Sequence, residues 1–350
     1  MQDSKFQNQI DLQSSIFKLR EKASESLKKL LHHTTYGTNG ACYRHLDTLE
    51  RIEELDNPLH LSLNRNDKVL GNCTFCRRNG DWYIRFFTFE TSFRSSGKIN
   101  KHEKKSKLKA ELTNFFNSAL ENGVNEEKVN SFYAYIEPKN VRSIQMSENF
   151  GFQKCATVIT QTYSRIKPKK TNRFVEIKNW DEIKSSIESN FGNYSYYFDA
   201  YTQQGPFYGL KNDKGDLIAF CKYNEATWEI VRLPGKSGAF LTKIIPYIPF
   251  LNKIINPTKH TFIAPEAVWV KDNNPSLVDE LFSGLLHKKN KTLILWWTDK
   301  KDTLFKSTVK KINWGLLHKL VGQTEVNVMR KANHKLDENL VHYVSCKDMI

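Results

Sequence analysis

The densest group of charged side chains that could do chemistry lies in residues 94–109. This stretch holds seven Lys or Arg and one Glu, so its excess is seven minus one, or six, positive charges. Ammonium and guanidinium groups form charge-assisted hydrogen bonds with phosphate oxygens, so such a segment can hold the phosphates of a cofactor or of RNA. A solvated surface loop has the same composition. The residues alone leave both interpretations open.

The cysteines could bind a metal ion. Six occur, at positions 42, 73, 76, 155, 221 and 346, and the one close pair, Cys73 and Cys76, has no matching second pair. A structural zinc ion needs about four Cys or His ligands, and the His residues nearby show no ligand spacing. We therefore expect no metal and predict that the cysteines are reduced thiols packed in strands.

The chain as a whole is basic. It has 53 Lys and Arg against 38 Asp and Glu, which gives a net charge of +15 and a pI near 9.3. We expect the surface to attract an anionic partner, which could be a nucleotide cofactor, RNA, DNA or a membrane. Hydrophobic residues at 39% and charged residues at 26% are typical of a globular protein rather than a disordered one.

A length of 350 residues predicts about two domains of common size. The N-terminal sequence MQDSKFQNQIDLQSS lacks the continuous apolar run of a signal peptide. The most apolar stretch, GAFLTKIIPYIPFLNKII, is interrupted by Lys243, Pro246, Pro249 and Lys253, so we predict no membrane span. These observations predict a cytoplasmic protein.

The elements of the first half must position any reactive groups found there. In chain order we predict strand 16–20, helices 21–31 and 44–55, strands 59–65, 69–78 and 81–90, helix 107–122, strand 131–137, helix 140–150 and strand 155–165. Asn79-Gly80 between alternating apolar runs is a strong hairpin signal. The pattern predicts a mixed α/β layer with an antiparallel half.

The basic segment IKPKKTN, with Pro168 in its middle, is predicted to be a linker. Beyond it a similar order of strands and helices begins again, although the residues barely match. This order predicts an internal duplication, with one domain in residues 1–168 and a second in residues 172–350.

A short helix is predicted between Asn140 and Gly151. An Asn side chain can accept hydrogen bonds from the first free backbone N–H groups, and Gly can adopt the left-handed conformation that ends a helix. The helix directly follows the apolar strand FYAYI. These signals explain the helix locally without assigning a function to it.

Together with the order of elements around it, this helix resembles the GCN5-related N-acetyltransferase (GNAT) superfamily. That family often has Asn, a small residue three positions on, an aromatic seven on, and Gly-Phe eleven and twelve on. Asn140, Ser143, Ser147, Gly151 and Phe152 hold these positions, and four of the five agree, because Ser147 replaces the aromatic. The resemblance implies an α/β fold with a mixed sheet and two GNAT-like domains in tandem.

The resemblance also implies an acetyl-CoA or other acyl-CoA site where strands 81–90 and 131–137 splay apart. The pantetheine would pair with the exposed edge of the first of these strands, and the pyrophosphate would bind backbone N–H groups at the start of the next helix. The family's phosphate loop corresponds to residues 94–99, although Ile99 stands where the family has Gly or Ala. The implied cofactor-binding residues are Thr88, Phe89, Arg94, Gly97, Lys98, Asn140, Ser143 and Ser147.

Acyl transfer to an amine needs a base for the amine proton, and the departing thiolate is commonly protonated by an acid. The resemblance places Glu90 and Glu137, at the ends of the two splayed strands, as candidate bases. The family's usual acid is a Tyr at the position of Ser147, so Tyr135 is the candidate acid here. In the second half the segment KDNNPS has no Gly and no Asn-to-Gly-Phe spacing follows, so we expect CoA to bind the first half only.

Three functions follow from these patterns. The leading one is an N-acyltransferase that moves an acyl group from acyl-CoA to a small-molecule or peptide amine. The second is an enzyme that transfers amino acids from charged tRNA, because such enzymes use paired halves of this fold and are often basic. The third is a non-catalytic module that binds RNA or a protein.

Overall fold

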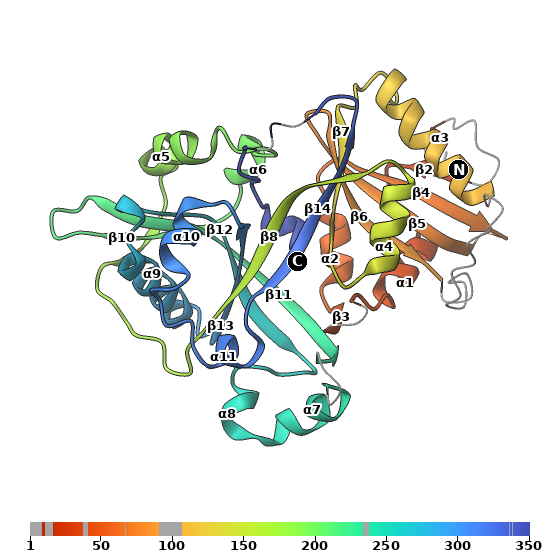
Figure 1. The fold of residues 1–350 in the computed structure, drawn as a ribbon. Helices are drawn as coiled ribbons and strands as arrows, with labels where there is room; N and C mark the ends of the chain where they lie inside the picture. Colours follow the sequence, from red (N-terminus) through yellow and green to blue (C-terminus); the bar gives the residue numbers. More distant parts are fainter. Residues whose placement is uncertain are drawn as a thin grey trace, which may run out of the picture.

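The computed structural model describes residues 9–10, 17–37, 41–66, 68–90, 107–233, 238–335, 337 and 339–350 (Figure 1). The first half contains β1 (Gln9–Ile10), β2 (Phe17–Arg20), α1 (Glu25–His32), β3 (Cys42–His45), α2 (Thr48–Glu53), β4 (Pro58–Arg65), β5 (Lys68–Arg78), β6 (Asp81–Phe89), α3 (Lys107–Asn122), β7 (Ser131–Ile136), α4 (Val141–Asn149) and β8 (Gln153–Ser164). The second half contains β9 (Phe174–Ile177), α5 (Asp181–Phe191), α6 (Asp199–Thr202), β10 (Phe207–Lys211), β11 (Leu217–Arg232), α7 (Gly238–Ile244), α8 (Pro249–Asn252), β12 (His260–Val270), α9 (Pro275–Lys288), β13 (Leu293–Asp299), α10 (Thr303–Thr308), α11 (Leu316–Val321), β14 (Thr324–Ala332) and α12 (Cys346–Met349).

The predicted antiparallel meander is confirmed in β4, β5 and β6, which pair in sequence. Asn79 and Gly80 both have positive φ, at 48° and 85°, as the tight hairpin between β5 and β6 requires. The prediction of a helix over residues 44–55 was wrong at its N-terminal end. Cys42–His45 is strand β3, which pairs with β11 of the second half, and α2 begins only at Thr48.

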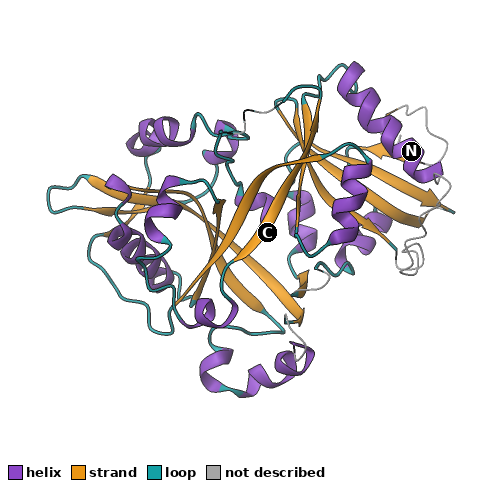
Figure 2. Cartoon of the chain, in the orientation of Figure 1, coloured by secondary structure: helices purple, strands orange, loops and turns teal. Residues whose placement is uncertain are grey.

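Each half contains one parallel pair of strands that soon diverges. β6 and β7 pair only from Asp81–Tyr83 to Ser131–Tyr133, and β12 and β13 pair at Ile263 and Ile294. Figure 2 shows the strands of the whole chain in orange, with helices packed on either side of them. The repeated parallel pair supports the internal duplication that the order of elements predicted.

The last strand of the chain joins the two halves. β14 lies between β7 and β8, and β8 pairs on its other side with β13. All of the described strands therefore belong to one 14-stranded sheet, and β8 and β14 cross the middle of Figure 1. The chain is a mixed α/β structure whose halves share their central strands. The boundary at residues 168–172 stays a prediction, and residues 165–173 form no regular element.

Within the residues that the structure describes, the three largest of five hydrophobic core clusters correspond to this arrangement. In the first half Phe115 and Phe116 of α3 pack on Phe75 and Phe132, as the helical spacing of apolar residues predicted. In the second half α9 packs against the sheet through an apolar face that includes Phe282. A third core contains side chains of both halves, with Tyr83 and Tyr133 from the first half and Phe262, Leu295 and Trp297 from the second. The halves therefore bury apolar surface against each other.

The six cysteines are free, and all except Cys346 of α12 lie in strands. In the described part of the chain, no three His, Cys, Asp or Glu side chains are grouped as metal ligands. Among the described helices, none is both long and apolar enough to cross a membrane.

Candidate active site

A cavity of about 700 Å³ opens where β6 and β7 diverge. Beyond the last pair, Tyr83 and Tyr133, β6 contributes Ile84, Arg85, Phe86 and Phe87 to the cavity wall, and β7 contributes residues 134–136. β5 and β14 pair with the outer edges of these two strands, so their inner edges face the cavity. Strand edges of this kind present backbone N–H and C=O groups to a bound molecule.

A β-bulge at Phe86 bends β6 at this point. Phe86 has a φ of 52°, which costs a bulky residue on the order of 1–3 kcal/mol, and the register shifts beside it between Asn72 and Thr74. The Asn72 amide donates to Phe86 O at 3.3 Å and to Thr74 Oγ1 at 2.8 Å, and it accepts from Ser62 at 3.0 Å. These buried hydrogen bonds hold the strained backbone in place.

The predicted helix α4 borders the cavity with its N-terminal turns. Asn140 Oδ1 accepts from Ser143 N at 3.2 Å, and Gly151 has a φ of 87°, so both ends of the helix are capped as predicted. Asn140, Ser143 and Ser147 line the cavity. The Ser147 hydroxyl donates to Ile144 O at 2.8 Å. The start of α4 can therefore present N–H groups and a positive dipole end to an anion or a carbonyl.

The two candidate bases lie in different surroundings. Glu137 lines the cavity, and its burial raises the pKa of the carboxyl despite the opposing charge of Lys139. Glu90 forms an ion pair with Lys68 across the β5–β6 edge and is not among the described residues that line the cavity. The geometry thus favours Glu137 as a base.

Thr88 and Phe89 also lie apart from the described cavity wall. The Thr88 side chain is buried against Thr34, and the Phe89 ring occupies the space that a side chain on Gly71 would fill. The part of β6 that lines the cavity is residues 83–87, which directly precede Thr88 and Phe89. Arg94, Gly97 and Lys98 lie outside the described residues.

Tyr135, the candidate acid, contacts a histidine that the sequence did not indicate. The Tyr135 hydroxyl lies 2.8 Å from His342 Nε2. Burial lowers the pKa of His342 to about 3, so the imidazole is neutral, and burial raises the pKa of Tyr135 well above its ordinary value. Tyr135 therefore keeps its proton and can act as a hydrogen-bond donor.

In the segment of residues 342–350, Asp348, Met349 and Ile350 line the cavity. Asp348 accepts from Arg78 Nη1 at 2.7 Å and from Arg78 Nη2 at 2.5 Å, and its carbonyl accepts from the Tyr83 hydroxyl at 2.8 Å. Arg85 donates to the carbonyls of Lys347 and Ile350. The segment is thereby attached to β5 and β6.

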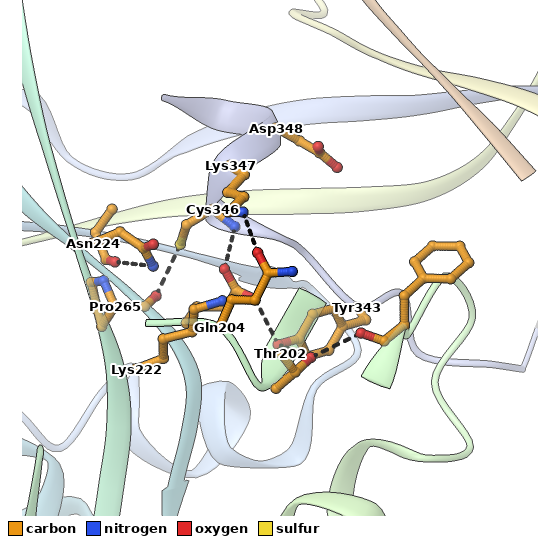
Figure 3. Close-up of polar contacts among 12 residues, drawn as sticks. Thr202, Gln204, Lys222, Asn224, Pro265, Tyr343, Cys346, Lys347 and Asp348 are labelled. Atoms are coloured by element: carbon orange, nitrogen blue, oxygen red, sulfur yellow. Dashed lines mark hydrogen bonds and ion pairs between the residues drawn. The ribbon is translucent and has the colours of Figure 1, made fainter. Parts of the chain in front are cut away.

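The same segment crosses the corresponding gap of the second half. His342 N donates to Asp299 of β13 at 2.7 Å, and Cys346 N donates to Glu266 of β12 at 2.8 Å. Figure 3 shows Cys346 and Tyr343 beside Lys222, whose ammonium group lies 3.6 Å from Glu266. β12 has its own bulge at Ala267, with a φ of 50°. Protein side chains therefore occupy this gap.

The chain is similar to known proteins in its fold. No family model matches the chain, and no curated protein matches it in sequence. A candidate acetyltransferase from Pyrococcus horikoshii has a TM-score of 0.52 and 13% identity, and the match covers 97% of each chain. N-myristoyltransferase from Saccharomyces cerevisiae, solved with bound myristoyl-CoA, has a TM-score of 0.52 and 9% identity over 95% of this chain and 86% of that one.

These matches extend over both halves of the chain. Because the sequence identity is so low, these matches show a shared arrangement of the backbone alone. The chain therefore has the fold of the GCN5-related N-acetyltransferase superfamily, in a tandem arrangement.

Proposed function

We propose that the chain is an N-acyltransferase that binds one acyl-CoA between β6 and β7 and transfers the acyl group to an amine. The observation that carries this proposal is that one cavity combines the two diverging strand edges, the bulge at Phe86 and the capped start of α4. The extended pantetheine arm of CoA can pair with strand edges, and the N-terminus of α4 can bind the anionic pyrophosphate of CoA.

The reaction needs a neutral amine. Its nitrogen attacks the thioester carbonyl, the carbon–sulfur bond breaks, and the products are an amide, a CoA thiolate and one proton. We assign the acceptance of that proton to Glu137, because it is the candidate carboxylate on the cavity wall and its raised pKa makes it a stronger base.

We assign to Tyr135 the stabilisation of the departing sulfur. A tyrosine whose pKa lies above about 10 transfers its proton unfavourably to a thiolate with a pKa of about 8.5, so hydrogen-bond donation is the better role. If His342 carries its proton on Nε2, it donates to the Tyr135 oxygen and leaves the tyrosine proton available to the sulfur.

In this proposal the second half shapes the binding site of the amine acceptor and does not itself bind CoA. Its own strand gap is crossed by residues 342–346, which are hydrogen-bonded to Asp299 and Glu266. β11, β12 and β13 nevertheless contribute Trp228, His260 and Trp297 to the shared cavity. We therefore expect one CoA per chain and an acceptor held between the halves.

Calorimetric titration of the full chain with acetyl-CoA, myristoyl-CoA and CoA tests the proposal. Asn140→Ala and Asn274→Ala form a matched pair, because each Asn caps a helix but only Asn140 lines the cavity. Each should reduce stability by about 1 kcal/mol. Only Asn140→Ala should weaken binding, by about tenfold.

Saturable binding of one CoA derivative per chain, weakened selectively by Asn140→Ala, supports the proposal. The same titration with bulk tRNA separates the tRNA-dependent and RNA-binding alternatives. Binding of tRNA without binding of any CoA derivative would replace this proposal with one of them.

A further inference from the structure

We propose that the cavity contains a subsite for a flat aromatic group of the amine acceptor. Its walls are the rings of Tyr36, Tyr43, His45 and Trp228, which we call the aromatic cluster. This inference rests on the proposed function and specifies the chemical class of the acceptor.

Both halves of the chain build the aromatic cluster. β3 pairs with β11, so that His45 lies opposite Trp228 and Tyr43 opposite Ile230. A second bridge holds Tyr36 beside Tyr43, with N–H to carbonyl distances of 2.8 and 3.1 Å in the two directions. The four residues are therefore fixed by backbone pairing, and all four line the same cavity as the diverging ends of β6 and β7.

The rings contact one another at short range. Tyr43 and Trp228 are stacked, with centroids 4.2 Å apart and planes at 12°. His45 lies edge-on, 5.0 Å from Tyr36 and 5.4 Å from Trp228. Aromatic rings attract a further flat ring in stacked or edge-on geometry more strongly than they attract a saturated group of the same size.

Three polar atoms of the aromatic cluster point to a hydrogen-bonding ligand. The Tyr36 hydroxyl, the Trp228 indole N–H and His45 Nδ1 are buried, and none has a hydrogen-bond partner in the described part of the chain. Buried polar groups are nearly always paired in folded proteins, and an indole N–H can only donate. A ring that carries a hydrogen-bond acceptor would pair with these atoms.

The charges around the aromatic cluster favour an uncharged ring. Burial, together with the nearby Arg85 and Arg51, lowers the pKa of His45 to about 3, so the imidazole is neutral at physiological pH. The same two cations disfavour a positive group beside it. Glu137 also lines the cavity and lies near Tyr43, because its charge, after burial, helps to raise the pKa of the Tyr43 hydroxyl; it offers the negative charge that an ammonium group needs. The amine would therefore approach Glu137 while the ring enters the aromatic cluster.

Three amines of similar length serve as probes of the full chain in the presence of CoA: tyramine, phenethylamine and 2-cyclohexylethylamine. Dissociation constants come from ligand-observed NMR titration. We expect tyramine to bind most tightly, because it has both a ring and an acceptor oxygen, and cyclohexylethylamine to bind at least tenfold more weakly. Equal affinity for the three amines, or binding of none of them, overturns the inference.

Two variants and one control locate the binding. Trp228→Leu should weaken tyramine binding by about tenfold and change the CoA affinity less than twofold. Trp180→Leu is the control, since this half-buried Trp packs on Phe207 outside the cavity wall. Equal losses of tyramine affinity in Trp228→Leu and in the control Trp180→Leu contradict the subsite.

Tyr36→Phe removes only the unpaired hydroxyl. We expect it to reduce the preference for tyramine over phenethylamine while leaving the melting temperature unchanged or higher. An unchanged preference contradicts the pairing role of this hydroxyl. Failure of CoA itself to bind would count against the proposed function, whereas CoA binding without any ring preference would count against the subsite alone.

Discussion

The ion pair between Arg78 and Asp348 attaches residues 342–350 to the first half, and Asp348→Asn tests how strongly. Both side chains are nearly inaccessible, at 3% and 1% relative exposure, and two hydrogen bonds of 2.7 and 2.5 Å join them. Asn keeps the shape but removes the negative charge, so a buried guanidinium loses its carboxylate. Loss of one partner from a buried pair typically costs about 3–5 kcal/mol.

Because a whole folded domain has only about 5–15 kcal/mol of stability, we expect the last residues to open locally before the rest of the chain unfolds. The measurement is the free energy of opening from hydrogen exchange of peptides that cover residues 342–350. It should fall by about 3 kcal/mol in Asp348→Asn.

The control is Glu188→Gln, which affects a solvent-exposed pair with Lys184 and should cost less than about 1 kcal/mol. The variant Arg78→Met/Asp348→Leu should recover much of the loss, since no buried charge remains. A loss below about 0.5 kcal/mol in Asp348→Asn would refute the idea that this pair attaches the segment.

Three further predictions concern the base and the fold. Glu137→Gln should lower turnover by about a hundredfold or more, and Glu90→Gln by much less, in steady-state assays with one acyl-CoA and one amine. Because burial raises the pKa of Glu137, the carboxylate that acts as base should form, and activity should rise, at a pH above the ordinary glutamate range. The folded state favours the protonated carboxyl, so the free energy of unfolding should fall as pH rises through the raised pKa. Glu137→Gln should then raise the melting temperature at neutral pH while it lowers the rate; a lower melting temperature would contradict the buried carboxylate. Gly315→Ala should destabilise in urea by at least about 2 kcal/mol more than Gly322→Ala, because a Cβ at Gly315 would lie 2.1 Å from Ser164 O, whereas Gly322 has open space; equal effects would contradict that packing.

Local signals predicted the local structure well. The Asn79-Gly80 turn, the spacing of Leu112, Phe115 and Phe116, and the Asn140 cap each depend on residues within a few positions of one another, and the structure contains all three features. The fold class followed from their order. Such features can be predicted from the sequence because capping, turn chemistry and helical periodicity are short-range effects.

The features that shape the cavity depend on contacts across the chain. Arg78 and Asp348 are 270 positions apart, Tyr135 and His342 are 207 apart, and β3 pairs with a strand of the other half. No local pattern marks the bulge at Phe86, and the cavity wall of β6 lies at residues 83–87 rather than at Thr88 and Phe89, whose role in cofactor binding stays a prediction. The aromatic cluster likewise combines residues whose proximity only the folded sheet reveals.

The location of acyl-CoA binding is the central claim, and hydrogen exchange of the full chain with and without saturating CoA tests it most directly. We expect protection in peptides from residues 83–87, 134–136 and 140–147, which line the first gap. Peptides from residues 263–270, which border the second gap and do not line the cavity, should exchange unchanged. Protection confined to the second gap, or no protection with any CoA derivative, would contradict the account.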